Sequence, residues 1–334
     1  MVNQRDVAKR AGVSSASVSR YINNPASISL KTANKIKNAI KELGYRPNFT
    51  AKSLKTGKFQ RVGIISAAKG PFYWEVLDSI EESLFESGYF INVSITRKSE
   101  FSKMKTLQLV KNRQVDGVII FPLLNQNDDE IVKYLKDMGD KFVVLDRPYE
   151  DESICQVSID NYEAGKTAAR TFLDRGHRDF LFIWGVKDVV SAHERFRGFQ
   201  DELKTAGIIL NEEMQIDGEF SAKKTYEITK KILPKLPKFT AVFASNDQSA
   251  IGFMKAAYEN GLITPNDYSI IGFDDMEFAP YVTPSLTTFR QPVQTMGKIA
   301  AEMLISQIEG REIRDTRVLL KARLLIRDSI KAIF

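Results

Sequence analysis

Cysteine and histidine are scarce in this chain. Its 334 residues contain one cysteine, Cys155, and two histidines, His177 and His193. A disulfide framework requires paired cysteines, and a zinc site requires about four suitably spaced ligands, so both are excluded. The sequence therefore predicts no metal centre, and it predicts no other cofactor.

Long apolar runs are missing as well. No stretch approaches the ~18–20 apolar residues that a membrane-spanning helix requires. The first residues, Met1 to Asp6, are polar where a secretory signal would be apolar. We therefore expect a cytoplasmic protein without a membrane partner.

The overall composition is that of a folded globular protein. Hydrophobic residues make up 43% of the chain and charged residues 27%, which excludes a disordered tail and a fibrous repeat. The length suggests two or three domains.

Positive charge is concentrated at the N-terminal end. Residues 1–61 contain thirteen Lys and Arg against two acids, a net charge of +11, whereas the remainder contains 35 bases and 40 acids, a net charge of −5. A short basic segment on a mildly acidic body is typical of a polyanion-binding module joined to a different domain. A solvated lysine-rich helix would have the same composition, so charge alone leaves both interpretations open.

Three helices are predicted in the first 46 residues. Ser14 and Ser29 stand where the N-caps of a second and a third helix belong, and Gly12 and Gly44 stand where the first and third helices would end. Apolar side chains at helical spacing give each helix one inward face: Val7, Ala8 and Ala11, then Val18 and Ile22, then Ala33, Ile36, Ile40 and Leu43. Two short helices joined by a Gly-containing turn and backed by a third form a helix-turn-helix domain.

The second predicted helix, Ser15 to Asn23, carries the residues expected to contact DNA. Small side chains at its start allow the backbone to approach the major groove closely, and Arg20 can form a bidentate pair with guanine. One such pair contributes roughly 1–3 kcal/mol of discrimination between bases. An ordinary surface arginine is the alternative for Arg20. The candidate contacts in this domain are Ser14, Ser15, Ala16, Ser17, Arg20 and Asn23.

A short segment after Pro47 is expected to act as a hinge. Residues 48–55 are fewer than the ~12–15 that an isolated helix needs to be even marginally stable in water, so a helix here should form only against a partner hinge and DNA. A flexible linker is the alternative. The expected domains are a DNA-binding domain at 1–46, a hinge helix and linker at 47–60 and an effector-binding core at 61–334, and Asn48 and Lys55 are candidate DNA contacts in the hinge.

From residue 61 onward, short apolar runs alternate with amphipathic stretches, which is typical of parallel α/β folds. The apolar runs include 62–65, 117–121, 142–145, 180–183, 241–244 and 269–273, and a further short strand is expected at 157–159, before Asp160. Residues 116–146 and 240–274 share one predicted order of elements: a strand, a loop, a helix, a second strand and then an aspartate. This internal similarity predicts two related lobes with a cleft between them.

Polar and aromatic residues follow several of these strands, at the sheet edge where α/β proteins bind ligands. Aromatic rings can stack on the C–H face of a sugar ring, while charged groups and amides bond its hydroxyls. A site built for hydroxyls discriminates strongly, because a missing hydroxyl leaves buried polar groups unpaired. The candidate effector contacts are Tyr73, Trp74, Asp146, Arg147, Ser191, Arg195, Phe220, Asn246 and Asp274.

Several of these residues also have a simpler structural interpretation. The aromatic pair Tyr73–Trp74 could belong to the core. Asp160 and Asp247 are expected to cap the helices that follow them, which leaves Asn246 as the ligand contact. Arg147 could meet an acidic or phosphorylated effector, or it could lie in solvent.

Four segments of the N-terminal region resemble the LacI/GalR family of bacterial transcriptional regulators, and the resemblance extends over essentially the whole chain. The segments are DVAKRAGVS at 6–14, VSR at 18–20, AIKELGYRPN at 39–48 and AKSLKTG at 51–57. The resemblance implies base contacts from Ser15, Ala16 and Arg20. It also implies a leucine, here Leu54, that inserts into the minor groove, where unstacking costs a few kcal/mol and is offset by contacts with the bent DNA.

The resemblance also implies the fold. It consists of an N-terminal all-α helix-turn-helix domain and an α/β two-lobed, periplasmic-binding-protein-like core of parallel sheets flanked by helices. The N-lobe would span about 61–160 and 291–320, and the C-lobe about 161–290 and 321–334. The effector is expected between the lobes, against Arg195, Asn246 and Asp274, with Phe220 at the position of an aromatic that stacks on the ligand.

The function expected from this family is repression of carbohydrate-utilisation genes, with an operator affinity that a small molecule changes. Release from DNA is the commoner response in the family. A homodimer should bind a pseudo-palindromic operator, because paired heads match such a site. The chain ends at Phe334 without the tetramerisation tail of the lactose-repressor branch. Residues 293–308 show no clear match to the motif with which the catabolite-control branch binds a phosphorylated protein, so we expect a dimer without a protein co-regulator.

Three alternatives remain open on the sequence. The effector could be a non-sugar molecule such as a nucleobase. The chain could be a sugar-binding transport protein, although a basic helix-turn-helix stands in place of an export signal. An enzyme is the third alternative, but GxGxxG, GxxxxGK[ST], GxSxG and HExxH are absent, and adjacent residues such as Asp274 and Asp275 point to opposite faces of a strand. We therefore assign no catalytic residue.

Overall fold

The computed structural model describes residues 2–46, 58–66, 70–95, 108, 111–112, 114–121 and 128–333. Contacts divide the chain into two compact units, Met1–Phe59 and Gln60–Phe334. The hinge residues Asn48, Leu54 and Lys55 lie outside the described residues. Each unit is therefore considered by itself.

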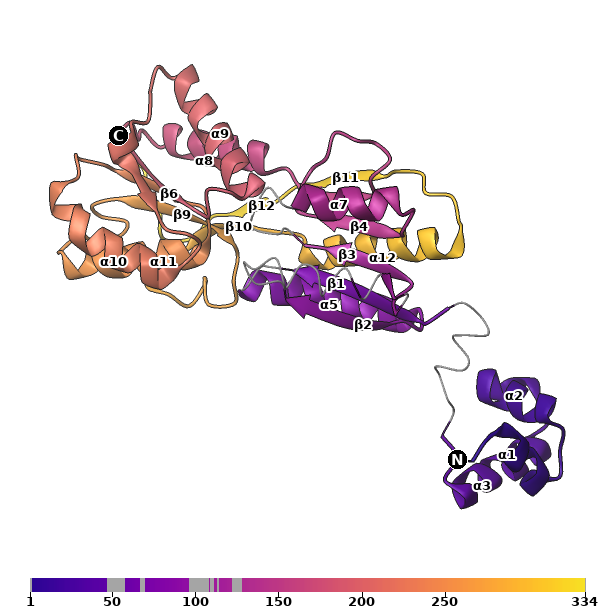
Figure 1. Ribbon diagram of the computed structural model, residues 1–334. Helices are drawn as coiled ribbons and strands as arrows, with labels where there is room; N and C mark the ends of the chain where they lie inside the picture. Colours follow the sequence, from indigo (N-terminus) through magenta and orange to yellow (C-terminus); the bar gives the residue numbers. More distant parts are fainter. Residues whose placement is uncertain are drawn as a thin grey trace. The chain divides into compact units, whose positions relative to one another are not determined.

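The N-terminal unit is a small helical domain (Figure 1). Its elements are α1 (Gln4–Ala11), α2 (Ser15–Asn23), the short 3-10 helix η1 (Pro25–Ser27) and α3 (Leu30–Leu43). Gly12 and Gly44 end α1 and α3 in the left-handed conformation, with φ of 66° and 57°. Ser14 and Ser29 cap α2 and α3, each by accepting a hydrogen bond from the backbone N–H three residues further on. The predicted caps and helix ends are thus confirmed.

A compact apolar core holds these helices together. Its fully buried members come from all three helices and from the residue that follows Gly44: Val7, Ala8, Ala11, Val18, Ile36, Ala39 and Tyr45. The inward face of α2 is therefore fixed by packing, and its opposite face is left to solvent.

The N-lobe of the core is built on a six-stranded parallel sheet in the order β11-β5-β4-β3-β1-β2. Its strands are β1 (Arg61–Ser66), β2 (Phe90–Ile95), β3 (Gly117–Ile120), β4 (Phe142–Leu145), β5 (Gln156–Ile159) and β11 (Arg317–Leu320), and its helices are α5 (Pro71–Glu86), α7 (Asp128–Asp137) and α12 (Val293–Glu309). The helix α12 packs against both α5 and the central strands. Strands buried on both faces explain the continuous apolar runs of the sequence.

The C-lobe repeats this plan in a second six-stranded sheet, in the order β12-β10-β9-β8-β6-β7, with β12 alone antiparallel to its neighbour. Its strands are β6 (Phe180–Trp184), β7 (Gln215–Asp217), β8 (Ala241–Ala244), β9 (Ser269–Asp274), β10 (Thr287–Arg290) and β12 (Arg323–Leu325). Its helices are α8 (Asn161–Leu173), α9 (Val190–Thr205), α10 (Ala222–Ile232) and α11 (Asp247–Glu259), with the 3-10 turns η2 (Glu212–Met214) and η3 (Leu233–Lys235). Two lobes, each a parallel sheet flanked by helices, agree with the expected fold class (Figure 1).

The chain passes between the two lobes three times. The first passage follows β5 into α8, the second follows β10 into α12, and the third joins β11 to β12. Residues at these passages can therefore contact both lobes.

Two glycines allow helices α8 and α9 to cross in close contact. A Cβ on Gly165 would lie 2.2 Å from the Arg195 carbonyl oxygen, and a Cβ on Gly198 would lie 2.0 Å from the Tyr162 carbonyl oxygen. Both distances are far below van der Waals contact, so only glycine fits. The crossing fixes the first turns of α9 and hence the position of Arg195.

The sequence pattern did not single out five strands, β2, β7, β10, β11 and β12. Strand β2 is the edge of its sheet, and its residues are all exposed or half-buried. Strands β11 and β12 are four and three residues long and begin with exposed arginines. Short or edge strands lack the apolar run that identified the others.

Candidate functional site

The outward face of α2 presents small polar side chains and one arginine. Ser15, Ala16 and Arg20 are exposed, whereas Val18 is buried in the domain core. The Ser14 Oγ accepts from the Ser17 backbone N–H at 3.1 Å and lies 2.9 Å from the Ser17 Oγ. Asn23 is the last residue of α2. This face offers a close backbone approach and an exposed guanidinium, the combination that major-groove reading requires.

Arg195 is the centre of the candidate effector site in the core. Its side chain is 3% exposed. Its Nε donates to Asn161 Oδ1 at 2.8 Å and one terminal nitrogen donates to the Ser245 carbonyl oxygen at 2.5 Å. The guanidinium also lies 3.5 Å from the centroid of the Phe273 ring. A cation held on three sides in this way is fixed in position, which suits a group that orients a ligand.

Two carboxylates, Asp146 and Asp274, face this arginine. Burial raises the pKa of Asp146 to about 6, against a smaller opposing effect of Arg195. Burial likewise raises the pKa of Asp274 to about 7, again opposed by Arg195 and by the hydrogen bond that Gln291 Nε2 donates to Asp274 Oδ1 at 2.7 Å. Asp146 directly follows β4 in the N-lobe and Asp274 is the last residue of β9 in the C-lobe, so the site takes a carboxylate from each lobe.

Tyr73 is the aromatic member of this cluster. Burial is the main reason that the pKa of Tyr73 is raised, and the charges of Asp146, Asp274 and Arg195 all act on it. Its ring packs edge-on against Phe72, with the centroids 5.2 Å apart. The neighbouring Trp74 is 58% exposed and belongs to no apolar core cluster among the described residues.

Two buried oxygen atoms in this region have no partner. Asp146 Oδ1 and Gln291 Oε1 accept no hydrogen bond from any residue that the structure describes. A buried acceptor left unpaired costs roughly 1–3 kcal/mol. Donor groups of a ligand, such as hydroxyls, would satisfy both atoms.

The backbone is strained at several of the same positions. Asp146, Phe220 and Asp274 have φ of 53°, 56° and 115°, in the region that non-glycine residues rarely adopt. Such conformations cost of order 1–3 kcal/mol each and cluster at ligand sites. Three of the nine candidate effector residues are held in this way.

Asn246 has the capping role that the sequence predicted for Asp247. Asn246, not Asp247, is the N-cap of α11, because its Oδ1 accepts from the Ser249 backbone N–H at 2.9 Å. Asn246 Nδ2 donates to the Phe220 carbonyl oxygen at 3.2 Å. The prediction that Asp247 caps this helix is therefore wrong, whereas Asp160 does cap α8 by accepting from Glu163.

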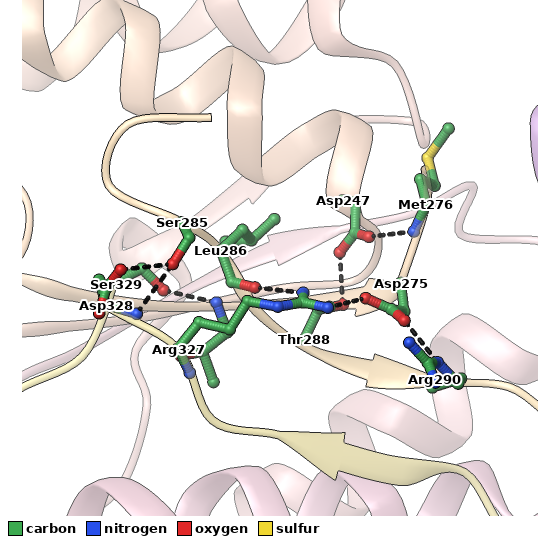
Figure 2. A network of polar contacts seen from close by, with 11 residues as sticks. Asp247, Asp275, Met276, Ser285, Leu286, Thr288, Arg290, Arg327, Asp328 and Ser329 are labelled. Atoms are coloured by element: carbon green, nitrogen blue, oxygen red, sulfur yellow. Dashed lines mark hydrogen bonds and ion pairs between the residues drawn. The ribbon is translucent and has the colours of Figure 1, made fainter. Parts of the chain in front are cut away.

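Asp247 instead anchors a polar network beneath the strand ends (Figure 2). It accepts from the Thr288 hydroxyl at 2.5 Å and from the Met276 backbone N–H at 2.9 Å. The adjoining Asp275 accepts from Arg290 Nε at 2.6 Å and from a terminal nitrogen of Arg327 at 2.5 Å. The network holds the turn that follows β9, and so it fixes the backbone on which Asp274 stands.

The remaining candidates lie at the margin of the cluster. Ser191 is buried in the first turn of α9 and contributes a hydrogen bond that lowers the pKa of Asp146. The Phe220 ring packs against Gly185, where a Cβ would lie 2.1 Å from it. Arg147 donates to Asp129 at 2.8 Å and lies 5.2 Å from the Tyr149 ring centroid. The guanidinium of Arg147 is thus engaged in a local ion pair.

Two residues that the sequence analysis did not single out belong to the cluster. Asn161 holds Arg195, and Gln291 holds Asp274. Both lie at passages between the lobes. Asn161 directly follows the predicted cap Asp160 and could have been found from that position, whereas Gln291 has no local sequence signal.

Comparisons with known proteins agree with this architecture. Residues 4–48 match the model of "Bacterial regulatory proteins, lacI family", and residues 169–330 match the "Periplasmic binding protein-like domain". The HTH-type transcriptional repressor PurR of Erwinia tasmaniensis is 32% identical over 333 residues, which cover 99% of this chain and 97% of that protein. The chain belongs to the LacI family.

Other LacI-family members share the full length of the chain. The ribose operon repressor of Escherichia coli K12 is 31% identical over 98% of this chain and all of that protein. The structure of the lac repressor dimer bound to operator and the anti-inducer ONPF has a TM-score of 0.87, 26% identity and 99% coverage of both chains. The structure of the transcriptional regulator CelR with cellobiose has a TM-score of 0.75 and 28% identity over 98% of this chain and all of that one.

This protein is therefore a LacI-family transcriptional repressor with a ligand-binding, periplasmic-binding-protein-like core. Its relatives are repressors, not enzymes, so the enzyme alternative is set aside. Among the described residues, no helix has the length and apolar character needed to cross a membrane.

Proposed function

We propose that this LacI-family repressor binds a pseudo-palindromic operator as a homodimer and that a carbohydrate bound between the core lobes changes its affinity for that operator. The observation that carries the proposal is the buried set of Arg195 between Asp146 and Asp274, with an unpartnered acceptor at Asp146 Oδ1. The unpartnered carboxylate oxygen of Asp146 requires a hydrogen-bond donor, and the hydroxyls of a sugar supply several donors on one small ring.

DNA recognition is assigned to α2 and the hinge. Arg20 reads a base edge, and Ser14, Ser15, Ala16 and Ser17 bring the helix close to the groove. Asn23 and the hinge residues Asn48, Leu54 and Lys55 are proposed as further contacts, with domain boundaries at 1–46, 47–60 and 61–334. The operator-bound dimer of the lac repressor supports this plan. Binding to chromosomal DNA would place the protein in the bacterial cytoplasm.

A carbohydrate effector is favoured over a nucleobase by the donor and acceptor balance of the cluster. A nucleobase presents its few polar groups in a single plane. Asp146 and Asp274 approach the ligand from strand ends in different lobes, and hydroxyls arranged around a sugar ring can bond acceptors in different directions. Cellobiose is bound in the CelR structure and ribose in a LacI-family regulator from Enterococcus faecium, which is 27% identical with a TM-score of 0.72. These sugars support the class of the ligand and leave the individual sugar open.

Each lobe contributes one carboxylate, and this is the basis of the proposed regulation. A ligand that bonds Asp146 and Asp274 together favours the arrangement in which the lobes are close. The ligand can shift the equilibrium only by as much as it binds the two arrangements differently. We expect release from DNA as the response.

The proposal is tested by a thermal-shift screen of the full chain against sugars, sugar phosphates and nucleobases. A ligand at 100 times its Kd stabilises the folded protein by about 2.7 kcal/mol. Asp274→Ala should abolish the ligand shift and the operator response while operator binding stays intact. A normal response in this variant would remove Asp274 from the site, and stabilisation by nucleobases alone would overturn the carbohydrate assignment.

A further inference from the structure

A cavity lies beside Asp146, where the chain first passes between the lobes. Its volume is about 250 Å³, and it is bordered by β5 and β11 of the N-lobe and by the first turns of α8 and α9 of the C-lobe. Its polar lining includes Asp146, Ser158, Asp160, Ser191, Glu194 and Arg317. Because both lobes form its wall, a group placed in this cavity would contact both.

The cavity is lined by different residues from the effector cluster around Arg195. Of the nine candidate effector residues, all of which the structure describes, only Asp146 and Ser191 line the cavity. A single ring held between Arg195 and Asp274 would therefore leave the other polar groups of the cavity without contact. Asp146 and Ser191 form the boundary between the two regions.

Among the charged groups that line the cavity, the three carboxylates Asp146, Asp160 and Glu194 outnumber the one guanidinium, that of Arg317. Asp146 is 5% exposed, and its Oδ1 has no partner among the described residues. Asp160 uses one carboxylate oxygen to cap α8, and Glu194 uses one for Arg197, so a second oxygen remains on each carboxylate. A ligand group that fits here must bring donors.

The amide side chains in the wall shape the cavity without offering donors to it. Gln156 Oε1 accepts from the Tyr149 backbone N–H at 2.7 Å, and its Nε2 donates to the Tyr149 carbonyl oxygen at 2.9 Å. Asn161 is likewise engaged on both sides, by Arg195 and by the Ile159 carbonyl oxygen. The buried Ser158, the carboxylates and Arg317 are thus the groups that contact an occupant, and a sugar hydroxyl can both donate to the carboxylates and accept from Arg317.

We propose that the effector carries two hydroxyl-bearing units, as a disaccharide does, with one unit between Arg195 and Asp274 and the second in the cavity beside Ser158 and Glu194. This inference rests on the carbohydrate effector proposed above and specifies its size. Whole small-molecule sites have volumes of about 300–1,000 Å³, so a cavity of about 250 Å³ accommodates part of a ligand. Asp146 and Ser191 contact the ligand near the linkage between the two units.

The experiment measures binding of monosaccharides and matched disaccharides to the full-length protein by calorimetry. The probes are D-glucose and D-galactose together with cellobiose, maltose, lactose and melibiose. At least one disaccharide should bind about tenfold or more tightly than its tighter-binding component, because a hydrogen bond to a charged acceptor contributes ~1.5–3 kcal/mol.

Two variants place the second unit. Ser158→Leu fills the cavity and should lower the affinity for the disaccharide to that for the monosaccharide, while the affinity for the monosaccharide stays unchanged. Glu194→Gln keeps the shape of a partly exposed side chain and should selectively weaken disaccharide binding by about tenfold. If Ser158→Leu disturbs folding, Glu194→Gln alone tests the position of the second unit. Asp201→Asn, elsewhere on α9, is the matched control and should change neither affinity, whereas Asp274→Asn should weaken both.

Each result decides a different point. Monosaccharides that bind as tightly as every disaccharide would overturn the two-unit effector and leave the carbohydrate function standing. A disaccharide preference that survives in both Ser158→Leu and Glu194→Gln would place the second unit elsewhere and overturn this use of the cavity. Binding of nucleobases without any sugar would overturn the proposed carbohydrate function itself, and this inference with it.

Discussion

The exposed face of α2 and the buried cluster around Arg195 both carry candidate binding residues, but the two regions hold them in different ways. Arg20 stands in solvent on a helix whose caps and core are complete. Arg195 is buried, two acids beside it have raised pKa values, and an acceptor atom of Asp146 has no partner. The first region is complete without DNA, whereas the second contains two buried oxygen atoms, Asp146 Oδ1 and Gln291 Oε1, that no described residue satisfies.

This difference predicts how each region responds to substitution. Removing an exposed contact from α2 should change binding and leave folding unchanged, since surface substitutions are usually within ±0.5 kcal/mol. Removing a member of the buried cluster should change both, because its neighbours are desolvated. Both tryptophans, Trp74 and Trp184, belong to the unit Gln60–Phe334, so tryptophan fluorescence reports unfolding of this unit separately from the helix-turn-helix unit.

The largest effect is expected for Arg195→Met. Loss of the guanidinium leaves Asp146 and Asp274 buried without their cation, and breaking such a group typically costs ~3–5 kcal/mol. Fluorescence-monitored unfolding of the core should shift accordingly at pH 8, and effector binding should be lost. Arg197→Met, an exposed arginine on the same helix, is the control. If the core of Arg195→Met is as stable as that of Arg197→Met, Arg195 does not stabilise the buried carboxylates of Asp146 and Asp274.

The next effect is a pH dependence of core stability. The pKa of Asp274 is raised to about 7 by burial, so between about pH 4 and pH 7 the folded core binds a proton that the unfolded chain has lost. Its free energy of unfolding should therefore fall as the pH rises through this range. The upper bound is about 4 kcal/mol, because one pKa unit corresponds to about 1.4 kcal/mol. Asp274→Asn cannot ionise and should reduce this slope to the part contributed by other buried carboxyls with raised pKa values, such as Asp146. An unchanged slope in this variant would contradict the assignment.

The fold follows from local sequence chemistry to a large extent, and the site follows to a lesser extent. Ser14, Gly12 and Gly44 act within a few residues of their own positions, so their roles were predictable from the sequence. The choice between Asn246 and Asp247 as a cap was not, because either side chain can cap a helix. Asp247 does not cap the helix, because its carboxylate accepts a hydrogen bond from the hydroxyl of Thr288, 41 residues away in the sequence. No local sequence pattern could predict this contact.

The same reasoning applies to the cluster itself. Strand ends identified Asp146 and Asp274, because parallel strands carry their ligands at one edge of the sheet. Gln291 was missed because its role depends on a passage between the lobes, which only the tertiary structure defines. Backbone strain at Phe220 was equally unpredictable, since aromatic residues rarely adopt positive φ.

A smaller effect, confined to the other region, is expected for Arg20→Ala. Loss of a bidentate pair with guanine should reduce operator discrimination by roughly 1–3 kcal/mol, while salt-sensitive binding to random duplex is kept. Fluorescence anisotropy with operator and competitor DNA measures both. Lys37→Ala, an exposed base on α3, should weaken binding to all sequences alike if it contributes at all. Equal losses on every duplex in Arg20→Ala would argue against base reading.

The smallest effect separates folding from recognition within the helix-turn-helix unit. Ser14→Ala and Ser29→Ala each remove one N-cap hydrogen bond and should each destabilise this unit by about 1 kcal/mol, measured by far-UV circular dichroism of the full chain, with the tryptophan signal unchanged. Only Ser14 stands on the proposed DNA-binding face, so only Ser14→Ala should also weaken operator binding at a temperature where both variants are folded. If both variants lose operator affinity equally, Ser14 acts on DNA through helix stability alone, and the face of α2 begins at Ser15.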